Sequence, residues 1–358
     1  MSALVGKGPL MSSLLLTGFP GFLASNLLPR ILLQRPDSHV QCLVEPRFME
    51  TARQRLQSLD PALHPRVHLI AGDITRPGLG LEQPLDPNEI FHFAALYDLG
   101  VDRSLGLRIN VDGTQNVLRY AQHCPKLEKL HYISTCYVSG RYTGPFRETD
   151  LDKGQRFNNY YEETKFLAEV EVQKSQLPWV IYRPSVVVGD SRSGATLKYD
   201  GPYPVIKWLL RFPWVSILPQ IGDPSMIRIN LVTQDYVLDA LTYLSLHAGH
   251  PGTVYQLSDP NPVTVEEMVS ELGRVTHRKI IHVPLPLSVA KAALHHLKFV
   301  SKLSGFTHAM VDYFVHPTHY LCDNTTQALE GSGVVCPDIR RVLPRLVEYV
   351  RRNPHPVG

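Results

Sequence analysis

The fold is decided near the amino terminus by residues 13–24, which read SLLLTGFPGFLA. The apolar run from Ser13 to Leu16 predicts a buried strand, and a helical pattern follows from Phe22 to Gln34. In the turn between them, Gly18 permits a tight bend and Gly21 lets backbone amides approach a pyrophosphate at the start of the helix. We therefore predict a dinucleotide-binding loop formed by Thr17, Gly18, Phe19, Pro20, Gly21, Phe22 and Leu23.

Short apolar runs continue to alternate with helical stretches along the first half of the chain. Strands that alternate with helices predict a parallel sheet covered on both faces, with ligands at the carboxyl ends of the strands. The predicted fold class is therefore α/β, a doubly wound parallel sheet. The further predicted strands are Val40–Val44, Val67–Ile70, Phe91–Leu96, Lys129–Ser134 and Trp179–Tyr182.

The alternation stops after Gly189, where proline, glycine and aromatic residues become frequent. We predict a dinucleotide-binding domain over residues 12–190, to which segments at about 226–257 and 320–336 return. Residues 191–358 are predicted to form mainly a smaller, interleaved substrate-binding region.

The composition is that of a globular protein that binds no nucleic acid. Of the 358 residues, 44% are hydrophobic and 19% charged, and the net charge of +3 is too small for a basic nucleic-acid surface. No stretch of about eighteen apolar residues predicts a membrane span, and the first residues lack the features of a signal peptide. The five cysteines have no metal-ligand spacing, which favours reduced thiols, a cytoplasmic location and no bound metal.

The end of the second predicted strand is where a dinucleotide-binding fold reads the adenosine ribose. An acidic residue at this point favours a free 2′-hydroxyl, and a basic one favours a 2′-phosphate. Side chains of both charges are present here: Glu45 is acidic, Arg47 is basic, and Arg53 and Arg55 follow shortly after. These residues leave the choice between NAD and NADP open.

The next two strand ends supply further candidate cofactor contacts. Asp73 and Ile74 follow the third predicted strand, where Asp73 is placed near the adenine. Ala94 and Ala95 end the fourth, where small side chains offer a flat surface to a cofactor.

A catalytic set is predicted from one hydroxyl and one helix face. Thr135 follows the fifth predicted strand, and Tyr161 and Lys165 stand at positions i and i+4 of a predicted helix. A phenol is a poor base at neutral pH, so a neighbouring ammonium is expected to lower its pKa. The Thr135 hydroxyl is expected to hold the substrate oxygen beside the phenol.

Together these segments resemble the extended short-chain dehydrogenases/reductases, and within them the thioester reductase domains and fatty acyl-CoA reductases. The resemblance covers about Ser13 to Leu241 and rests on segments such as TGFPGFLASNLLPRIL, HYISTCYVSG and YRPSVVVGDSRSG. It implies the catalytic trio Thr135, Tyr161 and Lys165, with Lys165 also holding the nicotinamide ribose.

The resemblance also implies contacts at both ends of the cofactor. The nicotinamide end would meet Pro184, Val186 and Val187, and Asn110 would be mainly structural. Where this chain has Glu45, the branch has an arginine that reads the 2′-phosphate. Arg55 matches a second phosphate contact of the branch, so NADP(H) and NAD(H) both stay open as cofactors.

The substrate region is apolar and aromatic, which suits a hydrophobic carbonyl substrate but equally suits core packing. Its aromatic and branched residues include Tyr199, Tyr203, Trp208, Phe212, Trp214 and Ile217. The stretch Lys291–Lys302 has one basic and one apolar stripe, typical of a lid helix, a peripheral membrane contact or a docking face for coenzyme A or an acyl carrier protein.

We therefore expect an NAD(P)H-dependent oxidoreductase that reduces a fatty acyl thioester or a long-chain aldehyde, and expect it to form a homodimer as is common in the superfamily. A ketone reductase or alcohol dehydrogenase of the hydroxysteroid or 3-hydroxy-lipid type is the nearest alternative. A sugar-nucleotide epimerase or dehydratase uses the same trio, and a cofactor-sensing protein binds the dinucleotide without turnover.

Overall fold

The computed structural model describes residues 12–289, 292 and 312–355. The chain divides into two compact units. The first contains the described residues up to Ser134, together with Thr164–Tyr182 and Leu241–Thr253. The second contains Thr135–Glu163, Arg183–Ala240 and the described residues from Val254 onward. These units are defined by which parts of the backbone pack together and not by what they bind. The predicted assignment of residues 12–190 to the cofactor and 191–358 to the substrate therefore stays a prediction.

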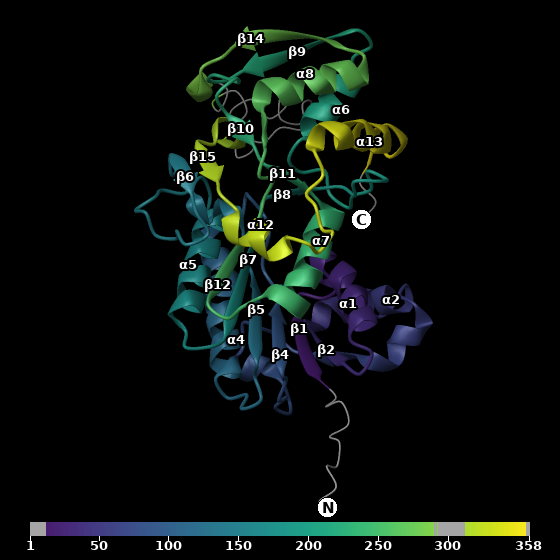
Figure 1. Ribbon diagram of the computed structural model, residues 1–358, viewed down its shortest axis with the longest axis vertical. Coiled ribbons are helices and arrows are strands. Elements are labelled where there is room, and N and C mark those ends of the chain that lie inside the picture. Colours follow the sequence, from purple (N-terminus) through teal and green to yellow (C-terminus); the bar gives the residue numbers. More distant parts are fainter. Residues whose placement is uncertain (1–11, 290–291, 293–311, 356–358) are drawn as a thin grey trace, which may run out of the picture. The chain divides into compact units, whose positions relative to one another are not determined.

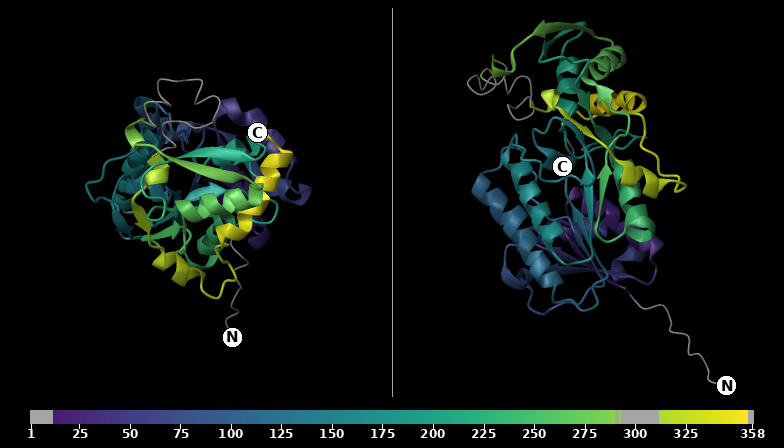
Figure 2. Two further views of the ribbon diagram at one scale, coloured as in Figure 1. Left: turned by 90° about the horizontal axis from the view of Figure 1, so that it is seen from above. Right: turned by 60° about the vertical axis from the view of Figure 1, so that its left-hand side comes forward.

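The first unit is built on the predicted parallel sheet. The sheet has seven strands in the order β12-β7-β5-β4-β1-β2-β3, and β1 is paired with β2 and β4 in parallel. Helices α1 and α2 cover one face and α4 and α5 the other (Figure 1, Figure 2). The elements are β1 (Ser13–Thr17), α1 (Phe22–Gln34), β2 (His39–Val44), α2 (Met49–Gln57), β3 (Val67–Ala71), β4 (Glu89–His92), α3 (Arg103–Gly106), α4 (Gly113–Ala121), β5 (Lys129–Ile133), α5 (Tyr160–Lys174), β7 (Trp179–Pro184) and β12 (Thr253–Leu257). Of these, residues 160–163 of α5, 183–184 of β7 and 254–257 of β12 belong to the second unit.

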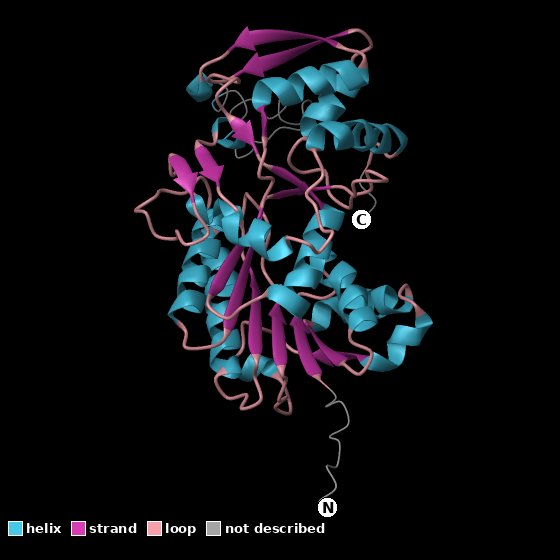
Figure 3. Cartoon of the chain, viewed as in Figure 1, coloured by secondary structure: helices cyan, strands magenta, loops and turns pink. Residues whose placement is uncertain are grey.

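The apolar pattern explains why this sheet forms. Leu14, Leu15 and Leu16 are all buried, as expected for a strand covered on both faces. The predicted fold class is thereby confirmed, and Figure 3 shows the helices packed beside the strands of this sheet.

The fourth strand is shorter than predicted. It ends at His92, whereas the apolar run continues to Leu96. Side chains take over beyond His92: the hydroxyl of Thr17, where the paired strand β1 ends, accepts from the Ala94 N–H (3.1 Å), and the Asn110 amide accepts from the Leu96 N–H (2.7 Å) and donates to the Leu96 carbonyl (3.3 Å). Side chains thus replace the neighbouring strand as partners of this backbone.

A buried polar network stands where β4 begins. Glu89 accepts from the guanidinium of Arg35 (2.6 Å) and from Nε2 of His131 (2.9 Å), whose Nδ1 meets the Tyr182 hydroxyl (3.0 Å). Burial by itself would raise the pKa of Glu89, but hydrogen bonds and charges from His131 and Arg35 hold it at about 2. Burial lowers the pKa of His131, while its hydrogen bond to Glu89 and the charge of that carboxylate act in the opposite direction.

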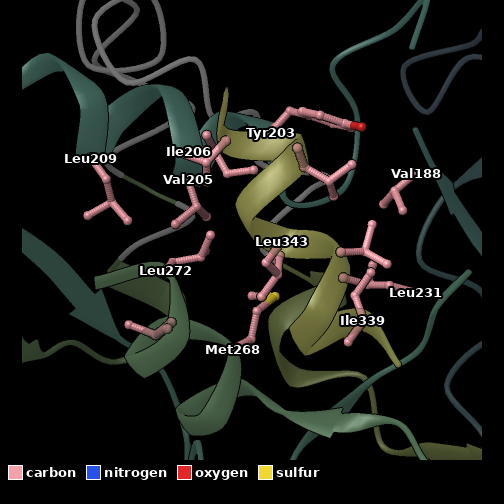
Figure 4. Close-up of a cluster of buried hydrophobic side chains, with 14 of the residues drawn as sticks. Val188, Tyr203, Val205, Ile206, Leu209, Leu231, Met268, Leu272, Ile339 and Leu343 are labelled. Carbon is pink, nitrogen blue, oxygen red and sulfur yellow. The ribbon is translucent and has the colours of Figure 1, made fainter. Parts of the chain in front are cut away.

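The second unit has its own apolar core, made mainly by three helices. Tyr203 and Leu209 from α6, Leu272 from α8, and Ile339 and Leu343 from α13 point toward one another in Figure 4 and are all fully buried. The elements of this unit are β6 (Gly144–Phe146), β8 (Val186–Val188), α6 (Tyr203–Arg211), β9 (Val215–Gln220), β10 (Arg228–Ile229), β11 (Leu231–Thr233), α7 (Gln234–Tyr243, which continues into the first unit), β13 (Val263–Thr264), α8 (Val265–Thr276), β14 (Lys279–Pro284), β15 (Thr318–Tyr320), α12 (Asp323–Leu329) and α13 (Ile339–Arg352).

A buried carboxylate joins distant segments within the second unit. Glu148 accepts from the backbone N–H groups of Gln256 (2.8 Å), Asn324 (2.5 Å) and Thr325 (3.1 Å), and from the Thr325 hydroxyl (2.7 Å). Nearby, β15 pairs with β6 in parallel. The carboxylate therefore holds the start of α12 against Gln256 and the segment after β6.

All five cysteines are free thiols, and four of them are buried. Across the described ranges, no helix is long and apolar enough to cross a lipid bilayer.

Candidate active site

The loop between β1 and α1 brings two glycines into tight backbone contacts. Gly18 has a φ of +89°, and a Cβ there would lie 2.7 Å from the Ala94 nitrogen. A Cβ on Gly21 would lie 2.6 Å from the Gly18 carbonyl oxygen, which the Gly21 N–H already contacts at 2.7 Å. Only residues without side chains fit both positions.

The amino end of α1 is open to an anion. Gly21 occupies the N-cap position of α1, and no side chain among the described residues caps the helix there. The first turn contains no acidic residue. The N–H groups of this turn have no partner within the helix and carry the positive end of its dipole. A glycine cradle beneath an uncapped helix terminus fits the pyrophosphate of a dinucleotide.

A buried histidine that the sequence did not point to supports this loop. His92 Nδ1 lies 2.8 Å from the Thr17 hydroxyl, and its Nε2 lies 3.0 Å from the Thr114 hydroxyl. The Thr17 hydroxyl also accepts from the Ala94 N–H at 3.1 Å. Burial, and then the charge of Lys165, lowers the pKa of His92 to about 3, so the ring is neutral. It therefore joins β1, β4 and α4 by hydrogen bonds and carries no charge.

Asn110 has the structural role that was predicted for it. Besides its two bonds to Leu96, its amide donates to the Thr164 hydroxyl at 3.0 Å. Thr164 lies on α5 between the two candidate catalytic residues of that helix. Asn110 therefore links the end of β4 to α5.

The candidate adenosine contacts lie at the ends of β2 and β3. The Glu45 carboxylate pairs with Nε of Arg47 at 2.7 Å, and Arg55 donates to Asn26 of α1 at 3.3 Å. Asp73 accepts from the N–H and the hydroxyl of Thr75, both at 2.8 Å. Ile74 is buried, and Ala95 is exposed. The predicted roles of Asp73, Ile74, Ala94 and Ala95 toward the cofactor stay predictions.

Thr135 and Tyr161 meet in the second unit. Thr135 caps the turn Cys136–Ser139, where its hydroxyl accepts from the Tyr137 N–H at 3.3 Å. The same hydroxyl lies 3.4 Å from the Pro184 carbonyl oxygen and forms a hydrogen bond with Tyr161. Burial raises the pKa of Tyr161 above its usual value. The expectation of a lowered pKa was therefore wrong for this arrangement, and the phenol is protonated at neutral pH.

Lys165 follows Tyr161 by one helical turn on α5 and belongs to the first unit. Its ammonium donates to the Ile133 carbonyl oxygen at 2.6 Å and to the Tyr132 hydroxyl at 2.9 Å. Burial lowers the pKa of Lys165 to about 7. These two contacts use two of the three N–H groups of the ammonium.

The predicted nicotinamide contacts lie where β7 gives way to β8. Pro184 ends β7, and Val186 and Val187 begin β8, which pairs in parallel with β11. Pro184 is buried, while both valines are half-buried. Their contact with the nicotinamide stays a prediction.

The aromatic residues of the substrate region have unlike surroundings. Tyr203 is fully buried in the core of the second unit, so packing explains it. Trp208 donates its indole N–H to the Ile217 carbonyl oxygen at 3.0 Å, while Trp214 is 78% exposed.

The basic stretch Lys291–Lys302 lies outside the described residues except for Ala292. Within the described ranges, no group of His, Cys, Asp or Glu side chains has the arrangement of a metal site.

Replacing Gly18 with alanine is expected to weaken cofactor binding at least tenfold, because the new methyl group meets the Phe93–Ala94 backbone and the left-handed φ costs roughly 1–2 kcal/mol. Gly78→Ala is the matched control: its φ is +60°, but a Cβ there has nothing within 4 Å. Titration of NADPH and NADH by protein fluorescence measures the effect. Equal dissociation constants for the two variants would contradict the role of the Gly18–Gly21 loop in cofactor binding.

Comparison with known families agrees with this geometry. The model of an NAD-binding family described as Male sterility protein matches residues 16–241, more than half of the chain. The chain belongs to this family. Membership confirms the predicted extended short-chain dehydrogenase/reductase type, an oxidoreductase with a nicotinamide cofactor.

Curated relatives of this family member include much longer proteins. It is 26% identical to a subunit of the linear gramicidin synthase of Brevibacillus parabrevis over 95% of this chain and 7% of that protein. It is 28% identical to Fatty acyl-CoA reductase 1 of Arabidopsis thaliana over 40% of this chain and 35% of that protein. The chain therefore spans well under two thirds of the length of these relatives.

Solved structures of similar fold include the terminal R domain of the myxalamid PKS-NRPS pathway. That domain has a TM-score of 0.80 and 27% identity, over 96% of this chain and 91% of the other. UDP-Glucuronic acid 4-epimerase from Bacillus cereus, in complex with NAD, has a TM-score of 0.65 and 21% identity over 95% and 99%. The second likeness concerns the fold alone.

Proposed function

We propose that this chain transfers hydride from NADPH or NADH to the carbonyl carbon of a hydrophobic acyl thioester or long-chain aldehyde. The observation that carries the proposal is the buried phenol of Tyr161, hydrogen-bonded to the Thr135 hydroxyl and one helical turn before Lys165 on α5. A carbonyl that receives hydride needs a proton on its oxygen, and a phenol that keeps its proton at neutral pH is the matching donor.

The bound nicotinamide supplies the hydride. Tyr161 donates its proton to the carbonyl oxygen as negative charge develops there, while the Thr135 hydroxyl orients that oxygen. In its charged form Lys165, fixed to β5 by two of its N–H groups, has a third N–H for the nicotinamide ribose. With a thioester, NAD(P)H and one proton are consumed, the carbon–sulfur bond breaks, and an aldehyde, a thiol and NAD(P)⁺ are released.

The chain holds the cofactor through its backbone and small side chains. The Thr17–Leu23 loop binds the pyrophosphate, and Ala94 and Ala95 lie along the cofactor. Asp73 and Ile74 meet the adenine, and Pro184, Val186 and Val187 meet the nicotinamide. Support comes from the glycine cradle and the uncapped end of α1.

A thioester carried on coenzyme A or on an acyl carrier protein is the proposed form of the substrate. The names of the relatives support it, since they include a fatty acyl-CoA reductase and several nonribosomal peptide synthetases. A cytoplasmic location, peripheral membrane contact and a homodimer belong to the same proposal.

The test is the oxidation of NADPH and of NADH, followed at 340 nm, with long-chain acyl-CoA thioesters, long-chain aldehydes and hydrophobic ketones in parallel. We expect turnover of thioesters or aldehydes, with the aldehyde or alcohol identified by mass spectrometry. Turnover of ketones alone would indicate a ketone reductase of the hydroxysteroid or 3-hydroxy-lipid type instead. Cofactor that stays bound through purification, with no net oxidation, would point instead to an epimerase or dehydratase.

A further inference from the structure

A carboxylate that the proposed chemistry does not use is buried on the same helix as Lys165. Glu169 follows Lys165 by one turn of α5, at positions i and i+4, so the two side chains lie on one face of the helix. Both are buried, and Glu169 is 0% exposed. Burying a carboxylate is costly unless hydrogen bonds and an opposite charge compensate for the lost water.

Hydrogen bonds fix the Glu169 carboxylate beside the end of β5. The Ser134 hydroxyl donates to its Oε2, and the Gln173 amide donates to its Oε1 at 2.9 Å. Ser134 directly follows Ile133, whose carbonyl oxygen accepts from the Lys165 ammonium at 2.6 Å. Consecutive residues of the chain therefore hold the ammonium and the carboxylate, and all of these groups belong to the first unit.

The charge of Glu169 acts on Lys165 against the effect of burial. Burial lowers the pKa of Lys165 to about 7, and the charge of Glu169 works in the opposite direction. Of the other groups around the ammonium, the Tyr132 hydroxyl accepts from it at 2.9 Å, and His92 of β4 is neutral, with a pKa of about 3. Tyr161, one turn earlier on α5, keeps its proton because burial raises its pKa. Of these groups, Glu169 is the one that supplies a negative charge.

We propose that Glu169 is a positioning residue that keeps the Lys165 side chain charged, so that its third N–H stays available to the nicotinamide ribose. An uncharged amine has two N–H groups, and the Ile133 carbonyl and the Tyr132 hydroxyl accept from both. Loss of the proton would therefore leave no donor for the ribose. The inference rests on the cofactor binding in the proposed function and not on the substrate.

The pH dependence of cofactor binding tests the inference, with NADPH and NADH titrated separately into the full chain by protein fluorescence. In the unmodified chain we expect binding to weaken as the pH rises through about 7, where Lys165 loses its proton. Glu169→Gln removes the anion and is expected to lower the midpoint of this loss by at least about one pH unit. Glu169→Asp keeps the charge and is expected to restore most of that shift.

Glu171→Gln is the matched control, because Glu171 lies on the same helix but accepts from the Gln115 amide at 3.0 Å. This variant is expected to leave the midpoint unchanged. If Glu169→Gln left the midpoint where it is, or if Glu171→Gln lowered it as far, the inference would be overturned.

Urea unfolding without cofactor, at pH 6 and pH 8.5, separates this inference from the proposed function. Glu169 and Lys165 attract each other only while Lys165 is charged, which in the folded chain is below about pH 7. Glu169→Gln is therefore expected to lower the free energy of unfolding more at pH 6 than at pH 8.5, and Glu171→Gln to have equal effects at both. An equal loss for Glu169→Gln at both pH values would assign Glu169 to packing alone and overturn the inference. If the expected pH dependence appeared in a chain that binds neither dinucleotide, the proposed function would fail while the action of Glu169 on Lys165 would stand.

Discussion

Tyr161→Phe is expected to lower kcat for thioester or aldehyde reduction by about 10²–10⁴-fold, the usual contribution of a positioned proton donor. The substitution keeps the ring, which is only 9% exposed, and removes the hydroxyl that bonds to Thr135. Cofactor affinity and the unfolding midpoint are expected to change little. Single-turnover measurements at saturating cofactor would separate the loss of the chemical step from any loss of binding.

The adjacent residue provides a matched control. Tyr160 begins α5 and is 47% exposed. Tyr160→Phe removes the same atom from the same turn of helix and is expected to leave kcat within about twofold of the unmodified chain. If both substitutions lowered kcat alike, or if Tyr161→Phe kept full activity, Tyr161 would not be the proton donor.

Glu89→Gln is expected to lower the free energy of unfolding by about 3 kcal/mol at pH 7, because the pKa of Glu89 falls from an ordinary 4.5 to about 2 on folding. A carboxyl whose pKa is lower in the folded chain stabilises the fold above its unfolded pKa. That stabilisation disappears as the pH falls toward 2. The difference between variant and unmodified chain should therefore be full at pH 7 and shrink between pH 5 and pH 2.

Urea titrations at pH 7, 5 and 3.5 would measure this difference. Glu50→Gln is the control, since Glu50 forms an exposed pair with Arg53 and is expected to contribute less than about 1 kcal/mol at any pH. A loss for Glu89→Gln that is the same at pH 3.5 and pH 7 would show that packing, and not the charge, accounts for it.

The fold could be predicted where local patterns act alone. The helix predicted from Phe22 to Gln34 has these bounds in the structure, because its apolar spacing and the preceding glycine turn are both local. The fourth strand was overextended, because the backbone of Ala94 and Leu96 bonds to the side chains of Thr17 and Asn110 and not to a neighbouring strand. Hydrophobic periodicity contains no information about such a bond.

The candidate site shows the same contrast between spacing and surroundings. The i and i+4 spacing placed Tyr161 and Lys165 on one helix, as observed. It did not indicate that Lys165 would bind the Ile133 carbonyl of β5, or that burial would raise the pKa of Tyr161. Likewise, His92 appears in the sequence as one polar residue in an apolar run, and only tertiary structure pairs it with Thr17 and Thr114.

The contacts of Glu148 have a consequence for how the protein is made. Its four hydrogen-bond donors come from residues 256, 324 and 325, and the helix α13 that completes the core of the second unit ends at Arg352. While the chain is still on the ribosome, a nascent second unit would have to bury this carboxylate without most of its donors. The segments up to the end of α13 at Arg352 must therefore be synthesised before this unit can fold, whereas most strands of the first unit's sheet have emerged long before.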